Sequence, residues 1–212
     1  PSIRALQILL SYCDEYAYDH DIVYNVKKSV CMCFRPKPLK HFDPVFILTG
    51  NCLKCVSDHM YLGFNMSSNQ KDDVAIRQQC RNLYSRGNSI IRNFSACSDK
   101  VKCQLFQSYC TNFYCAPLWC RYTVETFRSL KVAYNRIFRI LLGLLSRTSM
   151  SASFIARSLN PFPVIIRKHI VSLRCRVYNS SNNLLRTVAG SLYFTNCSLI
   201  LLWNKSVILK AQ

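Results

Sequence analysis

The spacing of hydrophobic residues divides the chain into two parts near residue 71. In residues 2–19 apolar side chains recur at helical spacing, and Ser2 precedes them as a plausible N-cap. The remainder of the first part consists of short apolar runs broken by Pro and Gly, which is typical of strands. We therefore expect one amphipathic helix and then a small β-unit. The predicted inward side of the helix comprises Ile3, Leu6, Leu9 or Leu10, Cys13 and Ala17, and Gln7, Asp14 and Glu15 are expected to face water.

Short apolar segments predict the strands of this β-unit. Apolar and cysteine side chains alternate after Ser29, which is the period-2 pattern of a strand. Pro36 and Pro38 lack backbone N–H donors for a ladder, so the segment that contains them is predicted to turn. The predicted strands are 22–24, 29–34, 45–48 as partner of 29–34, and 60–64, with turns at 35–39 and 49–51.

After residue 71 the hydrophobic spacing becomes that of helices. Apolar residues recur at intervals of 4, 3, 4, 3 and 4 from Ile76 to Phe94, which predicts a long helix starting near Asp72. A similar run from Phe127 to Leu144 predicts another. Further helices are expected from Ser98 to near Pro117 (inward Val101, Cys103, Leu105 and Tyr109), over 149–158, and over 164–178 (inward Ile166, Ile170, Leu173 and Val177). Residues 191–209 are apolar and β-branched enough for strands, and a frayed, non-native end is the alternative.

Charge is distributed unevenly between the two parts. The chain has 28 Lys and Arg against 10 Asp and Glu, a formal net charge of +18. The first 73 residues balance, so the whole excess lies in 74–212, where Asp99 and Glu125 are the only acids. Positive charge of this density favours a polyanionic partner, of which nucleic acid is the commonest. An anionic membrane surface is the alternative.

The thirteen cysteines are expected to be mostly free thiols. Their number is odd, and the helical patterning differs from a loop-rich disulfide scaffold. We expect an intracellular protein, nuclear or cytoplasmic. No apolar run reaches the ~18 residues of a membrane span. Pro1 in place of Met suggests that the sequence is an excerpt of a longer chain.

A zinc site is a competing interpretation of some of these cysteines. Cys52 and Cys55 have zinc-like spacing, and Cys31 and Cys33 lie on a neighbouring predicted strand. His41 and His59 are nearby in sequence. Cysteines are scattered along the whole chain, however, so close pairs also arise by chance. We therefore expect no bound metal.

Several short motifs, in their order and spacing, resemble the C-terminal palm and thumb of LINE-type, non-long-terminal-repeat retrotransposon reverse transcriptases. The resemblance covers most of residues 3–178. The motifs are Ala5-Leu6-Gln7, Cys13-Asp14-Glu15-Tyr16-Ala17, Asn25-x-x-Lys28-Ser29, Met32-x-Phe34, Tyr61-Leu62-Gly63, Arg86-Gly87-Asn88, Phe94, Tyr109-Cys110, Pro117-Leu118-Trp119, Ala133-Tyr134-Asn135-Arg136 with Arg139, and Arg147 to Ser151.

The resemblance implies an α+β fold: a partial polymerase palm followed by a mainly α-helical thumb. The palm portion, a helix plus a small antiparallel β-unit with a primer-grip-like hairpin, would occupy 1–70. The basic thumb would occupy 71–180, and 181–212 remains unassigned. The implied partner is an RNA or DNA template–primer duplex, together with the fingers and remaining palm that would precede this sequence.

In the family, carboxylates of a Tyr-Ala-Asp-Asp hairpin hold two Mg²⁺ ions, which activate the primer 3′-hydroxyl. That hairpin is absent from this sequence, which begins about ten residues beyond the matching position. We therefore expect no bound cofactor and no primer extension by this chain alone, with Mg²⁺ needed only by a complete polymerase. Asp72 and Asp73 are adjacent, but they are predicted to be charges at a helix start rather than metal ligands.

The resemblance also implies supporting roles for particular residues. Lys28 would lie near the incoming nucleotide, unless the alignment slips to Lys27 or the lysine is simply a solvated turn residue. Tyr61, Leu62 and Gly63 would form the primer-grip hairpin, with Gly63 allowing close backbone approach. The residues expected to meet duplex phosphates are Arg77, Arg81, Arg86, Lys100, Lys102, Arg128, Lys131, Arg136 and Arg139. A non-enzymatic nucleic-acid-binding helical protein derived from such an element is the alternative function.

Overall fold

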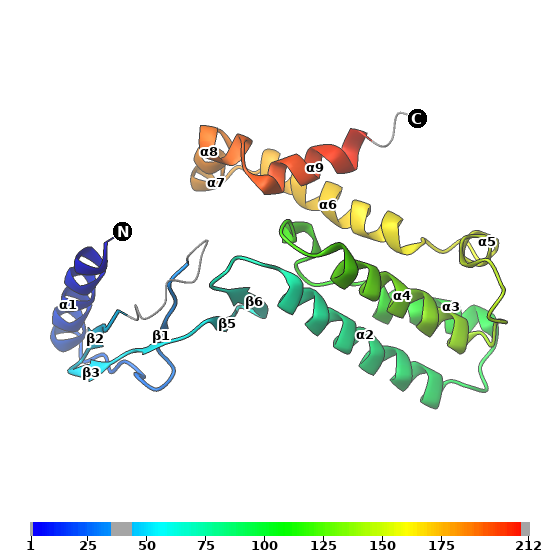
Figure 1. The fold of residues 1–212 in the computed structure, drawn as a ribbon, viewed down its shortest axis with the longest axis horizontal. Helices are drawn as coiled ribbons and strands as arrows, with labels where there is room; N and C mark the ends of the chain where they lie inside the picture. Colours follow the sequence, from blue (N-terminus) through cyan, green and yellow to red (C-terminus); the bar gives the residue numbers. More distant parts are fainter. Residues whose placement is uncertain (1, 35–43, 209–212) are drawn as a thin grey trace. The chain divides into compact units, whose positions relative to one another are not determined.

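The computed structural model describes residues 2–34 and 44–208 (Figure 1). The chain combines many helices with a few very short strands, so the α+β prediction is confirmed at this level. It divides into two compact units, 1–71 and 72–212, and each is described by itself below. The predicted turn at 35–39, with Pro36 and Pro38, and the candidate ligand His41 lie outside the described residues.

In its described residues, the N-terminal unit contains one helix and three two-stranded pairings. Its elements are α1 (Ile3–Asp19), β1 (Val30–Cys31), β2 (Ile47–Leu48), β3 (Asn51–Cys52), β4 (Lys54–Cys55), β5 (Asp58–Tyr61) and β6 (Phe64–Ser67). β1 pairs with β4 in parallel, and β2–β3 and β5–β6 are antiparallel hairpins. The predicted strand 22–24 is wrong, and the pairing of 29–34 with 45–48 is wrong as well, because β2 folds back on β3 through the Thr49–Gly50 turn.

Polar side chains attach α1 to β2. The helix begins as predicted, with the Ser2 hydroxyl accepting a hydrogen bond from the Ala5 N–H at 3.1 Å. The Gln7 amide then donates to the Ile47 carbonyl and accepts from the Ile47 N–H, both at 3.0 Å. Further along the helix, Asp14 accepts from the Thr49 N–H at 2.9 Å. Gln7 and Asp14, which were expected to face water, are half-buried, and their side chains also bond to the backbone at the edge of β2, which needs partners there.

All regular elements in the described part of the C-terminal unit are helices, joined by short loops. It comprises α2 (Asp73–Asn93), α3 (Asp99–Cys110), the 3₁₀ turn η1 (Ala116–Leu118), α4 (Val124–Leu141), α5 (Met150–Ala156), α6 (Phe162–Tyr178), α7 (Asn183–Ala189), α8 (Leu192–Thr195) and α9 (Ser198–Ile208). The predicted helices from Asp72 to Phe94, from Phe127 to Leu144, over 149–158 and over 164–178 are confirmed within a few residues at their ends. The helix predicted from Ser98 to near Pro117 is shorter, because α3 ends at Cys110. The strand character of 191–209 is wrong: Ile200 and Trp203 are buried there, and the Trp203 Nε1–H donates to the Pro117 carbonyl at 2.9 Å.

The core of this unit is built around α4. α2 and α4 run parallel, because Asp73 bonds to Thr123 at their starts and Gly87 meets Ile137 midway. An added Cβ at Gly87 would lie 2.5 Å from Ile137 Cγ2, so glycine allows the two helices to approach closely. Phe106 of α3 packs against α4, with its ring centroid 4.9 Å from the ring centroids of Tyr134 and Phe138.

The inward face of α3 differs from the predicted one. Phe106 and Cys110 are buried, whereas Val101 and Tyr109 are exposed. The large Phe106 ring fits among the aromatic rings of α4, and this packing sets the rotation of α3. Within the described residues, no helix is both long and apolar enough to cross a membrane.

Candidate nucleic-acid interface

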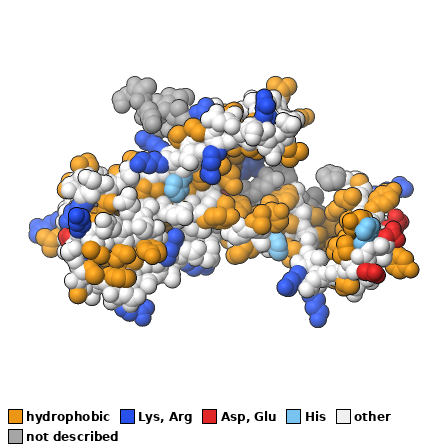
Figure 2. Space-filling model, turned by 180° about the vertical axis from the view of Figure 1, so that it is seen from behind, with side chains coloured by type: hydrophobic (Ala, Val, Ile, Leu, Met, Phe, Trp, Pro, Cys, Tyr) orange, Lys and Arg blue, Asp and Glu red, His pale blue; other side chains and the backbone are white. Residues whose placement is uncertain are grey.

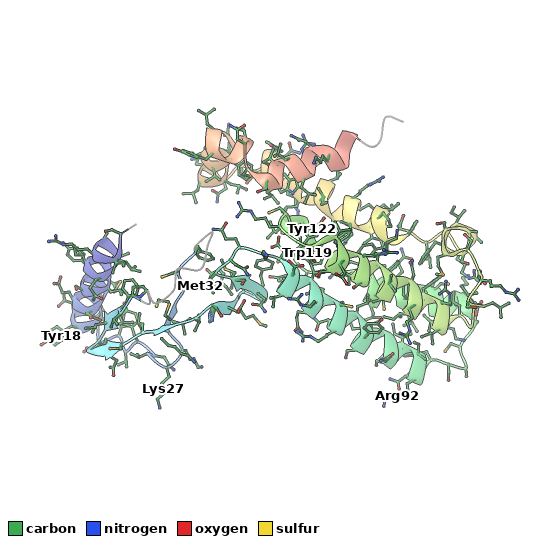
Figure 3. The ribbon with its side chains drawn as sticks, viewed as in Figure 1. Tyr18, Lys27, Met32, Arg92, Trp119 and Tyr122 are labelled. Carbon is green, nitrogen blue, oxygen red and sulfur yellow. The ribbon has the colours of Figure 1, made fainter. Side chains whose placement is uncertain are left out.

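The exposed arginines of α2 form one stripe along the helix. Arg77 and Arg81 are exposed one turn apart, as the periodicity predicted. Arg92 extends the same stripe at the end of α2 (Figure 3) and was missed, although its spacing of 11 residues from Arg81 was a usable signal. Arg81 donates to the Gln78 side-chain oxygen at 2.6 Å, which holds its guanidinium close to the helix surface.

Arg86 has a different position from the other arginines of α2. Its Nε donates to the Asn82 carbonyl and its Nη1 to the Asn112 carbonyl just beyond α3, while its Nη2 is buried. Burial raises the pKa of the nearby Cys110 thiol to about 11, and the Arg86 charge opposes that rise. Arg86 therefore ties α2 to the end of α3.

The candidate cations of α4 lie on several sides of the helix. Arg128, Lys131 and Arg136 are exposed, whereas Arg139 is half-buried and its Nε has no hydrogen-bond partner in the part of the chain that the structure describes. On α3, Lys100 is exposed and Lys102 is half-buried. Arg77, Arg81, Arg128, Lys131 and Arg136 have no carboxylate within 4.0 Å among the described residues.

One α4 arginine shares a side of the bundle with the α2 stripe. Gly87 marks the side of α2 that faces α4. At about 100° per residue around the helix axis, the arginines of α2 lie roughly 80–140° from Gly87 in one direction. Ile137 marks the side of α4 that faces α2, and Arg136 lies roughly 100° from Ile137 around the α4 axis, in the opposite direction. In two parallel helices, opposite rotations point to the same side of the pair. We call this surface the cationic face and define it as Arg77, Arg81, Arg92 and Arg136.

The cationic face lies on the side of the α2–α4 pair that α3 leaves open. By the same count, Tyr134 and Phe138 turn to the other side, where Phe106 of α3 contacts them. Lys131 also turns to the α3 side, and Arg128 points directly away from α2. The view in Figure 2 shows many Lys and Arg side chains, and few carboxylates, over this unit. The predicted set of nine cations thus contains three members of one face.

Asp72 and Asp73 bind backbone groups at the shared start of α2 and α4. The Asp72 carboxylate accepts from the N–H groups of Cys120 and Arg121 at 2.8 and 2.7 Å. Asp73 accepts from the Thr123 N–H at 3.0 Å and from its hydroxyl at 2.7 Å. Two parallel helices bring their positive ends together, and these carboxylates neutralise that charge. These hydrogen bonds join the starts of α2 and α4.

The pKa values of the Asp72 and Asp73 carboxyl groups are shifted in opposite directions. Burial raises the pKa of Asp72 above its ordinary value, although the N–H donors of Arg121 and Cys120 oppose the rise. Burial also raises the pKa of Asp73, but hydrogen bonds from Thr123 and Thr126 and the charge of Arg77 outweigh it, so its pKa lies below the ordinary value. Asp73 is therefore the more firmly ionised of the two.

The Tyr61-Leu62-Gly63 motif forms the tip of the β5–β6 hairpin. Leu62 and Gly63 form the two-residue turn with φ of 49° and 78°, the backbone of a type I′ turn. Tyr61 and Leu62 are exposed. A leucine is rare at positive φ, so the tip combines backbone strain with an exposed apolar side chain.

Lys28 lies at the end of a turn organised by Asn25. Its N–H donates to the Asn25 carbonyl at 3.0 Å and to the Asn25 side-chain oxygen at 3.2 Å, and the Ser29 hydroxyl donates to the same carbonyl. The Lys28 side chain is exposed. The motif Asn25-x-x-Lys28-Ser29 thus has a structural reason for its asparagine and serine, and its lysine is available for an anion.

Two of the four candidate zinc-binding cysteines come together. Cys31 and Cys55 are opposite each other in the β1–β4 pairing. Burial is the main cause that raises the pKa of the Cys31 thiol to about 11, and its hydrogen bond with Cys55 adds to the rise. Cys52 instead pairs with Ile47 in the β2–β3 hairpin. Within the described ranges, no three His, Cys, Asp or Glu side chains are grouped to hold a metal ion.

Comparisons of the chain with models of protein families, with curated proteins and with solved structures find no match.

Proposed function

We propose that the chain binds nucleic-acid duplex through its phosphate backbone, as the C-terminal palm and thumb portion of a LINE-type reverse transcriptase. The cationic face is the observation that carries this proposal. Its arginines come from two helices and point to one open side. A surface of this kind attracts phosphates without reading base sequence. Lys100, Lys102, Arg128, Lys131 and Arg139 add positive charge around it.

Two features of the N-terminal unit support the polymerase assignment. The type I′ turn at Leu62–Gly63 gives the primer-grip-like motif the hairpin that the resemblance implies. Lys28 is exposed at the end of the Asn25 turn, where it can approach a phosphate. In this proposal the chain supplies duplex binding, and the metal-dependent step belongs to carboxylates that this sequence does not contain.

The alternative is a non-enzymatic nucleic-acid-binding protein derived from such an element. It is favoured by the packing of residues beyond the resemblance, since Trp203 and Ile200 complete the core of the 72–212 unit. A helical unit with its own core can bind a duplex without a catalytic partner.

A salt series tests duplex binding in both versions of the proposal. The measurement is fluorescence anisotropy of a labelled RNA–DNA hybrid, and of a DNA duplex of equal length, from low to physiological salt. We expect affinity to fall steeply, with log K decreasing by about 0.9 per log unit of salt for each phosphate contact on DNA. Absence of binding at low salt, or stronger binding to vesicles of anionic lipid, would overturn the proposal. Primer extension with Mg²⁺ and dNTPs by this chain alone would reject its non-catalytic part.

A further inference from the structure

Two cysteines of the N-terminal unit face each other across the β1–β4 pairing. Cys31 and Cys55 are opposite residues in this parallel pairing, and both are free thiols. Neighbouring strands lie about 4.7–4.9 Å apart, and side chains of opposite residues point to the same face. A disulfide needs Cα atoms about 4.4–6.8 Å apart. The backbone therefore holds this pair at a separation that a disulfide can bridge.

The structure favours this pair over the one that sequence spacing favours. Cys52 and Cys55 have the Cys-x-x-Cys spacing of redox motifs. In the fold, however, Cys52 is opposite Ile47 in the β2–β3 hairpin. The thiols of Cys31 and Cys55 form a hydrogen bond with each other. Their sulfur atoms therefore need only a small approach to reach the disulfide bond length of about 2.05 Å.

A small reagent can reach this pair. Cys31 and Cys55 are half-buried rather than enclosed. Cys31 lines an open groove of about 710 Å³ between α1 and the strands, together with Leu6 of α1 and Phe46. A disulfide reagent of low molecular weight can therefore approach the pairing from solvent.

The β1–β4 pairing is short, so a covalent bond would change how it opens. It contains two residue pairs, and the Val56 N–H extends it by donating to the Cys31 carbonyl at 2.9 Å. Short pairings at a surface open by local unfolding. A disulfide between Cys31 and Cys55 would keep the strands together when these hydrogen bonds break.

We propose that Cys31 and Cys55 form a reversible disulfide by exchange with a disulfide of low molecular weight, for which glutathione disulfide is the probe. In the first step, a thiolate of the chain attacks one sulfur of glutathione disulfide, forms a mixed disulfide and releases one glutathione. In the second step, the other cysteine attacks the protein sulfur of the mixed disulfide and releases the second glutathione. The two protein thiols lose two electrons and two protons, which the two released glutathione thiols carry.

Burial of Cys31 sets the order of the two steps. Burial is the main cause that raises the pKa of the Cys31 thiol to about 11, so this group is rarely a thiolate at neutral pH. Cys55 therefore attacks first and Cys31 second. The second step is intramolecular, and proximity compensates for the small thiolate fraction of Cys31.

The test equilibrates the full chain with glutathione and glutathione disulfide in several ratios, alkylates the remaining thiols and maps the disulfides by mass spectrometry. We expect the intramolecular Cys31–Cys55 bond to be the major disulfide. Trypsin cleaves after Lys54 and so separates Cys52 from Cys55. A Cys33→Ser chain distinguishes Cys31 from Cys33, which share a tryptic peptide.

Amide hydrogen exchange measures the effect of the bond on the fold. We expect oxidation to slow exchange of the Val56 amide at least about tenfold, because its hydrogen bond to Cys31 lies beside the new bond. The Cys52→Ser chain is the matched control, since Cys52 is an exposed thiol of the neighbouring hairpin. It should form the same disulfide at the same glutathione ratio and show the same slowing.

Two further variants test the order of the steps. In Cys31→Ser, Cys55 should stop at the mixed disulfide with glutathione. In Cys55→Ser, Cys31 should remain mostly reduced under the same conditions. Circular dichroism verifies that both variants fold, and mapping of the unsubstituted chain carries the test if either does not.

Several outcomes would overturn the proposal. One is a major disulfide between Cys52 and Cys55, or between chains. Another is glutathione attached to the exposed cysteines without any Cys31–Cys55 bond. Unchanged exchange at Val56 in the oxidised chain would reject the effect on the β1–β4 pairing. None of these measurements uses nucleic acid, so their failure leaves the proposed duplex binding to its own salt series.

Discussion

The side chain of Gln7 makes the hydrogen bonds to Ile47 that a neighbouring strand would make. It satisfies both backbone groups of that residue, each at 3.0 Å, from a helix 40 positions away in sequence. A prediction based on helical periodicity assigns such a glutamine to solvent, because only the folded chain places an unpaired strand edge beside it. Predictions of exposure are weakest for polar residues that complete another element in this way.

We expect Gln7→Leu to destabilise the N-terminal unit by about 1–2 kcal/mol, because it removes the two hydrogen bonds that tie α1 to the Ile47 N–H and carbonyl. The measurement is amide hydrogen exchange at Ile47, which should become faster. Gln104→Leu, at an exposed position of α3, is the control and should leave that amide unchanged. Equal exchange at Ile47 in both variants would contradict the role of Gln7.

At the scale of elements, the contact between α2 and α4 depends on Gly87. We expect Gly87→Ala to destabilise the unit by about 1–2 kcal/mol, because overpacking against Ile137 outweighs the better helix propensity of alanine. Urea unfolding measures the effect, and Asn88→Ala at the next, exposed position should cause no loss of stability.

A double-mutant cycle tests the cause of that destabilisation. Ile137→Ala alone should cost about 2–5 kcal/mol. In the Ile137→Ala background, the penalty of Gly87→Ala should largely disappear, because the methyl group then has room. A penalty that is the same in both backgrounds would place the strain elsewhere in the chain.

The Asp73 carboxylate makes the stability of this helix junction depend on pH. Its pKa is lowered in the folded chain, so its stabilising contribution is complete above the unfolded pKa near 3.8 and is lost as pH falls through the lower folded pKa. We therefore expect Asp73→Asn to reduce the loss of thermal stability on acidification below about pH 4. Asp19→Asn, which alters an exposed carboxylate at the end of α1, is the comparison. Parallel pH profiles for Asp73→Asn and the unsubstituted chain would contradict this assignment.

At the scale of the whole molecule, the open cationic face predicts where a duplex binds. We expect replacement of Arg77, Arg81 and Arg136 by Gln to lower the slope of log K against log salt by about 0.9 for each phosphate that is no longer neutralised. The matched control replaces Arg128, Lys131 and Arg186, three exposed cations outside the face, and removes the same charge. If both triple variants weaken binding equally, net charge rather than the face controls affinity.

The sequence supports different parts of this structure to different degrees. Helical periodicity is strong where one side of a helix is buried, so the inward positions Ile76, Leu83, Leu130 and Ile137 and the exposed Arg77 and Arg128 could be predicted. Two-residue strands are too short to show a period, and their pairing depends on contacts such as Gln7–Ile47. α9 is apolar on most sides and has no clear polar face to reveal a helix. Arg86 and the Asp72–Asp73 pair depend on partners 26 to 50 residues away.

The parallel arrangement of α2 and α4 also affects how the chain folds during synthesis. The backbone partner of the Asp72 carboxylate, the Cys120 N–H, is synthesised 48 residues after Asp72. At about 5–20 residues per second, a ribosome needs roughly 2–10 s to supply that segment. During that interval Ile76, Leu83 and Ile90 have no α4 to cover them. A nascent chain that has emerged from the ribosome only as far as residue 115 should therefore expose an apolar helix that chaperones recognise, and one from which α4 has also emerged should not.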